Sequence, residues 1–156
     1  MSQPLNNIDR FNLTTLKLFD ILYDAFPNPI DIESKEIGIA ASPDDADFTE
    51  SFKFAIFADS AVSWLVEEGF IRCDPMKFGT RYRNARLTMK GLTVLGYMPT
   101  SVTQSAKPES LSTKIKKTLA AGAEKAGTEA VKLLLTEVFK LATSPTFTHT
   151  LTGMQV

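Results

Sequence analysis

Four basic residues close together are the side chains in this sequence best suited to binding a ligand. Lys77, Arg81, Arg83 and Arg86 fall within one short segment. Ammonium and guanidinium groups at this density bind the phosphates of a nucleic-acid backbone. The alternative interpretation is a solvated hairpin with scattered cations, so the segment predicts either a phosphate-binding surface or an ordinary polar one.

Catalytic chemistry has little support in the sequence. The chain has one histidine, His149, and one cysteine, Cys73, and it lacks a glycine-rich phosphate loop, a metal-ligand cluster and a nucleophile signature. The acidic run over residues 44–47 lacks the glycine and the distal glutamate of a calcium loop, which favours a solvated turn. We therefore expect a protein that is not an enzyme, with no metal site and no cofactor.

Composition predicts one compact domain with an additional segment. The chain has 156 residues, 44% of them hydrophobic, and a formal net charge of -1. Its first residues resemble no signal peptide and no stretch is apolar enough to cross a bilayer, so we expect a cytoplasmic protein without a membrane partner. Charge is segregated, because residues 1–75 hold five basic and fourteen acidic side chains whereas residues 76–125 hold ten and two.

Hydrophobic periodicity predicts the elements that must position the cations. Residues 12–26 repeat apolar side chains at helical spacing, with Asn12 as the expected N-cap and prolines after the last turn. A very short strand over 29–32 and a weak helix over 34–41 follow. The apolar stretch 49–69 forms either one long helix or two shorter helices.

The cations themselves belong to a predicted hairpin. Gly69 suits a left-handed helix C-cap, and residues 70–72 and 82–87 alternate as two strands joined by a loose tip. Thr88 then stands where an N-cap belongs, and residues 89–96 form a short closing helix.

The run from Ser60 to Ile71, followed by a hairpin and then Leu87-Thr88-Met89-Lys90-Gly91, resembles winged helix-turn-helix regulators of the MarR and PadR type. By element order the resemblance covers about residues 10–98. It implies a helix-rich α+β fold, namely a winged helix-turn-helix core followed by a C-terminal amphipathic helix. It also implies a third helix in the DNA major groove and a basic wing on the flanking backbone.

The outer face predicted for the third helix is poorly suited to reading bases. It presents Ser60, Ser63 and Trp64 together with carboxylates that repel phosphate, and residues 54–71 contain no Asn, Gln or Lys and no Arg. An exposed Trp64 suits a protein interface. The alternative is that Trp64 packs against the N-terminal helix.

Aromatic residues cluster in this region, and core packing is the favoured interpretation over a ligand pocket or a base-stacking platform. The cluster comprises Phe48, Phe52, Phe54, Phe57, Trp64, Phe70 and Phe78. Phe52 and Ile56 lie off the main apolar stripe, so the start of the helix is apolar on more than one side. We expect another element or another chain to cover it.

The C-terminal part is predicted to be a linker over 99–111, an amphipathic helix over 112–143 and a tail over 144–156. Its apolar face predicts an interface made of Ile115, Leu119, Ala123, Ala126, Leu134, Leu135, Val138 and Phe139. Such a face docks on its own domain, pairs with another copy or binds something else. Self-association into a homodimer or larger oligomer is the preferred hypothesis, and balanced charges disfavour a membrane-surface helix.

Two functions remain from the sequence. The first is a winged-helix regulator that binds duplex DNA through its wing and oligomerises through its C-terminal helix. The second is a winged-helix protein-interaction module, such as an adaptor or an antitoxin-like or immunity-like inhibitor, without sequence-specific DNA binding. The resemblance favours the first narrowly.

Overall fold

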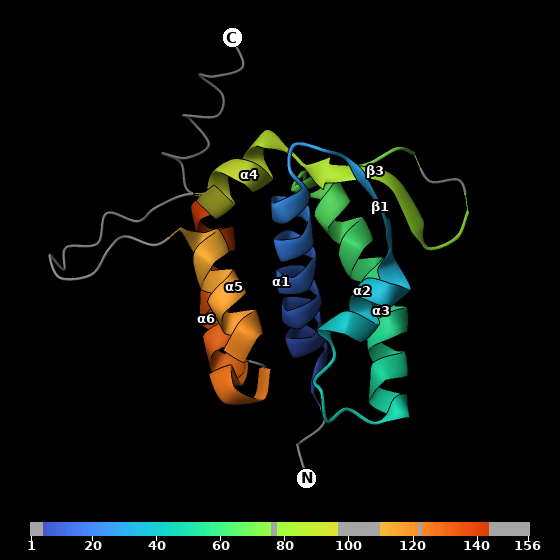
Figure 1. The fold of residues 1–156 in the computed structure, drawn as a ribbon, viewed down its shortest axis with the longest axis vertical. Helices are drawn as coiled ribbons and strands as arrows, with labels where there is room; N and C mark the ends of the chain where they lie inside the picture. The colour runs from blue at the N-terminus through green and yellow to red at the C-terminus, as the bar shows by residue number, and fades with distance from the viewer. Residues whose placement is uncertain (1–4, 76–77, 97–109, 122, 144–156) are drawn as a thin grey trace, which may run out of the picture.

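The computed structural model describes residues 5–75, 78–96, 110–121 and 123–143, without the side chains of 123–128. Within these ranges the fold is α+β and helix-rich, with six helices and a three-stranded antiparallel sheet (Figure 1). In chain order the elements are α1 (Asn7–Ala25), β1 (Ile30–Glu33), α2 (Ser34–Ala41), α3 (Phe48–Glu67), β2 (Ile71–Arg72), β3 (Arg81–Leu87), α4 (Met89–Gly96), α5 (Leu111–Ala121) and α6 (Ala123–Thr143).

Side-chain caps set the beginnings of the long helices. The Asn6 side chain accepts from the Asp9 N–H, so α1 begins before Asn12, and the prediction of Asn12 as N-cap is wrong. Asp47 caps α3 in the same way, by accepting from the Glu50 N–H. α3 then continues unbroken to Glu67, which decides in favour of one helix over two.

The sequence signals around the hairpin are confirmed. Gly69 has φ +81°, a left-handed conformation that a glycine adopts without strain and that turns the chain from α3 into β2. The Thr88 hydroxyl accepts from the Gly91 N–H and so caps α4. The strands pair in the order β1-β3-β2, with Ile32 opposite Tyr82 and Ile71 opposite Leu87.

The core forms around α1, whose inward face is completely buried. Leu16, Leu18 and Phe19 of α1 pack with Phe54 and Leu65 of α3, all with almost no exposed surface. The sheet adds its inward side chains to the same cluster, and α2 crosses α3 closely. This arrangement leaves one side of α3 and the outer face of the hairpin uncovered (Figure 1).

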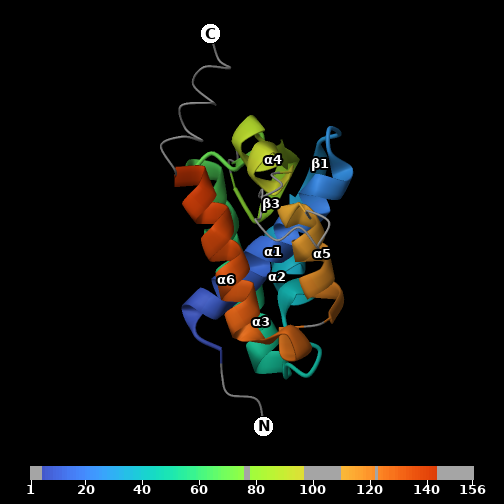
Figure 2. The same cartoon turned by 90° about the vertical axis from the view of Figure 1, so that its left-hand side faces the viewer.

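The C-terminal part forms two helices instead of the single helix predicted over 112–143. α5 ends at Ala121 and α6 begins at Ala123, and both pack against α1 and against each other. Leu111, assigned to the linker, starts α5 and is buried. Figure 2 looks onto α5 and α6, with α1 behind them. Residues 99–109 of the predicted linker and the tail 144–156 lie outside the described residues.

Polar contacts reinforce this docking on α1. Lys116 of α5 donates to Asp20 at 2.7 Å and to Asp24 at 2.6 Å. These hydrogen bonds raise the pKa of the Lys116 ammonium above its ordinary value. α5 therefore sits against α1 by charge as well as by apolar packing.

No helix in the described part of the chain is long and apolar enough to span a bilayer.

Candidate functional site

The predicted basic surface lies on the outward face of β3. Arg81, Arg83 and Arg86 are exposed, whereas the side chains of Tyr82, Ala85 and Leu87 are buried. Strict alternation would place Arg86 on the opposite face from Arg81 and Arg83, and the irregularity in the pairing near Asn84 shifts the pattern by one residue so that all three face outward. Exposed Arg72 of β2 lies opposite Arg86 across the hairpin. Lys77 lies outside the described residues. The structure therefore brings the three arginines of the prediction together on one strand.

Carboxylates accompany these arginines. Asp31 of β1 lies 3.3 Å from the Arg81 guanidinium and accepts the Asn84 N–H at 3.0 Å. The Asn84 side chain in turn donates to Asp74 at 2.7 Å. The backbone hydrogen bond from Asn84, assisted by Arg81 and Arg83, holds the pKa of Asp31 below its ordinary value. The positive charge that the hairpin presents is therefore partly neutralised.

Asn84 has φ +52°, at the point where the pairing of β1 with β3 shifts between Ile30 and Ile32. An asparagine tolerates this left-handed conformation better than most residues. Because its side chain and its N–H both bond to carboxylates, the bulge fixes Asp31 and Asp74 beside the arginines. Nothing in the local sequence pattern signalled this arrangement.

The predicted outer face of α3 is polar in its C-terminal half. Ser60 and Glu67 are exposed, and Ser63 is half-buried and donates to Glu67 at 3.4 Å. Trp64 is turned toward the domain, with its ring edge-on to Phe11 of α1 at 5.4 Å. A second edge-on contact joins Trp64 to Phe139 of α6 at 5.7 Å. Trp64 therefore packs against the N-terminal helix with one edge of its ring, while 41% of the residue remains exposed.

The N-terminal half of α3 is apolar and uncovered. Phe48, Phe52 and Ile56, here called the apolar stripe, recur every four residues and are 84%, 55% and 59% exposed. The rings of Phe48 and Phe52 stack with centroids 6.1 Å apart. Core packing was the wrong interpretation for these two rings. The expectation that this end of the helix needs another cover remains, because no described element of the chain supplies one.

The other aromatic residues divide between core and surface. Phe54 and Phe70 are buried as predicted, whereas Phe78 on the hairpin is almost fully exposed. Phe70, which directly precedes β2, lies edge-on to Phe139 of α6 with ring centroids 5.4 Å apart.

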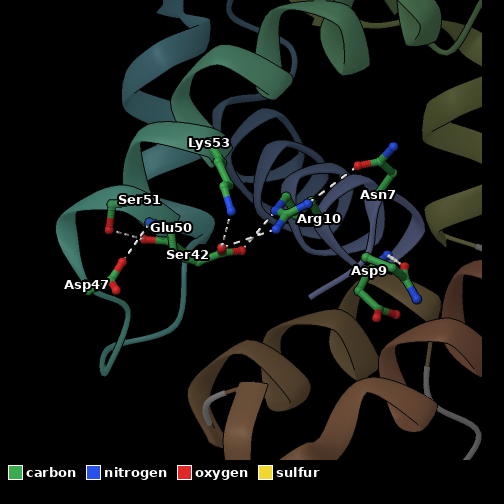
Figure 3. Close-up of polar contacts among 9 residues, drawn as sticks. Asn7, Asp9, Arg10, Ser42, Asp47, Glu50, Ser51 and Lys53 are labelled. Carbon is green, nitrogen blue, oxygen red and sulfur yellow. Dashed lines mark hydrogen bonds and ion pairs between the residues drawn. The ribbon is translucent and has the colours of Figure 1, made fainter. Parts of the chain in front are cut away.

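A buried ion pair holds the start of α3 against α1 (Figure 3). Arg10 donates through Nε to Glu50 Oε1 at 2.8 Å and through Nη2 to Glu50 Oε2 at 3.1 Å. Asn7 accepts a further, longer contact from Arg10, and Lys53 lies 3.8 Å from Glu50 on the solvent side. These contacts fix the helix turn that carries the apolar stripe. Sequence inspection missed them because the two charges are forty residues apart.

A second polar junction places the hairpin relative to the apolar stripe. Asp59 of α3 accepts from Ser34 Oγ of α2 at 3.1 Å and from Tyr82 Oη of β3 at 3.0 Å. Burial and the Asp59 hydrogen bond raise the pKa of Tyr82 well above its usual range, so the phenol remains a donor. The start of β3 is thereby attached to the middle of α3.

The predicted C-terminal interface is buried within the chain. Ile115, Leu134, Leu135 and Val138 are almost fully buried, and Leu119 and Phe139 are partly buried against the same core. The side chains of Ala123 and Ala126 lie outside the described residues. Of the alternatives considered for this face, the structure shows docking on its own domain.

The described residues contain neither a candidate metal site nor an activated thiol. No group of three or more His, Cys, Asp or Glu side chains is arranged there to hold a metal ion. Cys73 is half-buried, and burial followed by the charge of Asp74 raises the pKa of its thiol, which makes it less reactive.

No family model, curated protein or solved structure matches this chain.

Proposed function

We propose that residues 7–96 are a winged helix-turn-helix domain that acts as a protein-interaction module. The element order helix-strand-helix-helix-strand-strand supports the winged-helix assignment, as does the strand order β1-β3-β2. In this assignment α3 is the third helix and the hairpin of β2 and β3 is the wing.

The observation that carries the proposed function is the apolar stripe. A DNA-reading helix presents Arg, Lys, Asn or Gln to base edges, whereas α3 presents Phe48, Phe52 and Ile56. Two aromatic rings and an aliphatic side chain at the centre of an exposed face are the kind of anchors that bury well against another protein. Burying them in a DNA groove would leave base-edge hydrogen-bonding groups without partners.

Binding of DNA backbone is the second candidate, and the hairpin arginines favour it. Arg81, Arg83 and Arg86 are exposed on one strand, where they could contact phosphates without any base reading. The carboxylates Asp31 and Asp74 beside them lower the attraction for an anion. We therefore rank this candidate below protein binding.

Site-specific photo-crosslinking tests the proposed function in the cells that produce the protein. A photoreactive amino acid at Phe52 is compared with one at Leu133, an apolar residue of α6 that is also exposed. We expect protein adducts from the Phe52 position and few from the Leu133 position.

Fluorescence anisotropy with random duplex DNA, titrated with salt, tests the second candidate. A regulator would bind at low salt with a steep negative slope, and Arg83→Ala would reduce that slope. Such binding, together with equal crosslinking from Phe52 and Leu133, would overturn the proposed function. Weak binding that is insensitive to Arg83→Ala supports protein binding instead.

A further inference from the structure

We propose that the partner of the apolar stripe is a second copy of this chain, with the two α3 helices antiparallel about a two-fold axis near Phe52. This inference rests on the proposed function, because it names the partner of the same face. It accounts for three features of the surface: the spacing of the stripe, the distribution of charge along it, and its area.

The stripe is suited to pairing with itself. In a two-fold arrangement a surface meets its own copy, so residues on either side of the axis exchange partners. With Phe52 at the axis, Phe48 of each copy lies opposite Ile56 of the other. The stacked rings of Phe48 and Phe52 then form a continuous apolar strip with those of the second copy.

The charges at the two ends of the stripe are opposite. The acidic turn before α3 holds Asp44, Asp45 and Asp47, and Asp44 is exposed. At the other end lies the hairpin, which carries exposed Arg72, Arg81, Arg83 and Arg86, with Asp31 and Asp74 beside them offsetting part of this charge. An antiparallel pair brings the acidic end of each copy toward the basic end of the other, and this complementarity favours the antiparallel arrangement over the parallel one.

The hairpin lies on the same side of α3 as the stripe. Asp59, which bonds to Tyr82 of the hairpin, comes seven residues after Phe52 and eleven after Phe48. At 3.6 residues per turn both spacings return to nearly the same side of a helix. The start of β3 therefore lies near the C-terminal end of the stripe on this side of α3.

The area predicts a weak dimer. The exposed fractions of the three stripe residues correspond to about 400 Å² of apolar surface in each copy. With a polar rim from the turn and the hairpin, the total reaches about 1,200 Å², the lower end for specific interfaces. We expect a dissociation constant on the order of 10 μM, weakened by salt.

Sedimentation velocity of the full chain over a concentration series tests the proposal. The wild-type protein should sediment as a monomer at low concentration and as a dimer at high concentration. Phe52→Glu places two carboxylates at the axis and should remain monomeric throughout. Leu133→Glu makes the same change on α6 and should dimerise as the wild type does, and circular dichroism of both variants verifies that they fold.

Charge reversal tests the antiparallel arrangement. Arg83→Glu and Asp44→Arg should each raise the dissociation constant several-fold, and the double variant should return it toward the wild-type value. In a Cys73→Ser background, Phe52→Cys should form a disulfide-linked dimer under mild oxidation, and Leu133→Cys should not.

Several results would overturn the second copy as partner. A chain that stays monomeric at 0.5 mM, on the order of fifty times the expected dissociation constant, excludes it. A dimer unaffected by Phe52→Glu places the interface elsewhere. If the chain is monomeric and Phe52 nevertheless crosslinks to a different protein, the inference fails while the proposed function stands. If Phe52 also crosslinks no more than Leu133, both fail. Binding of Phe52 to anionic vesicles instead would assign the stripe to a membrane surface.

Discussion

The ion pair between Arg10 and Glu50 is the contact whose loss should most affect the position of the apolar stripe. Its two hydrogen bonds measure 2.8 and 3.1 Å. The side chains are only 10% and 17% exposed. Arg10→Met retains the length and much of the packing of the side chain but removes both donors. Glu50 then keeps only Lys53, at 3.8 Å and on the solvent side.

The expected cost follows from burial. Removing one partner of a buried pair costs about 3–5 kcal/mol. Because both side chains keep some solvent contact and Lys53 remains near Glu50, we expect Arg10→Met to lose about 2–4 kcal/mol. For a chain of this length the midpoint of thermal unfolding should fall by about 6–12 °C.

A double-mutant cycle in urea measures the interaction itself. Arg10→Met with Glu50→Leu leaves no unpaired charge, so the double variant should be more stable than the two single losses predict by at least about 1.5 kcal/mol. Lys53→Met, at the exposed member of the cluster, serves as control and should change stability by less than about 0.5 kcal/mol. Additive losses, or an Arg10→Met variant as stable as the control, would refute this account.

Three further predictions concern close packing, acid stability and docking of α6. A Cβ at Gly38 would lie 2.3 Å from a backbone oxygen of α3. Gly38→Ala should therefore lower the free energy of unfolding measured in urea by about 1–3 kcal/mol, although alanine has the better helix propensity. In the control variant Gly96→Ala the nearest atom to the new Cβ is 3.8 Å away, so stability should not fall. Because the pKa of Asp31 is lowered in the folded protein, its ionised carboxylate stabilises the fold at pH values above the ordinary pKa of 3.8. This stabilisation is lost as the pH falls through the lowered pKa. The stability advantage of wild type over Asp31→Asn should therefore shrink in acid, and an advantage that is constant with pH would contradict the assignment. Phe139→Ala should cost about 2–4 kcal/mol of stability. It should also shift the fluorescence of Trp64, the single tryptophan, because the two rings are in contact. Unchanged Trp64 fluorescence would contradict the docking of α6.

Local signals in the sequence predicted the elements around the hairpin well. Gly69 and Thr88 act through their own backbone geometry and their nearest neighbours, so their roles depend little on the rest of the chain. Alternation along β3 likewise places Arg81 and Arg83 on one face, whereas Arg86 joins them only through the irregularity near Asn84, which no local signal predicted. The start of α1 was placed too late because Asn6 and Asn12 both satisfy the pattern of a cap, and only the backbone shows which one is used.

The contacts that position the candidate site were not predictable, because they join distant residues. Asp59 meets Ser34 and Tyr82 across separations of 25 and 23 residues, and no periodicity links them. Arg10 and Glu50 are farther apart still. Hydrophobic periodicity finds a face that must be covered, yet it carries no information on what covers it.

That distinction separates the two apolar faces that the sequence marked. Two faces were expected to need a cover: the C-terminal amphipathic segment, and the start of α3 around Phe52 and Ile56. The first is covered by α1 of the same chain, through residues such as Leu135 and Val138. The second has no cover among the described residues.

The two outcomes together favour protein binding over DNA reading. A dimeric DNA reader needs a contact between copies that leaves the third helix free to enter the groove. Here the terminal helices pack against α1, and the exposed Phe48 and Phe52 form an apolar surface on α3 itself. In the proposed winged-helix arrangement, any partner that buries this surface also occludes the helix that would enter the groove. In the proposed protein-interaction module, the same side chains would therefore supply the contact surface and exclude sequence-specific recognition by α3 while it is occupied.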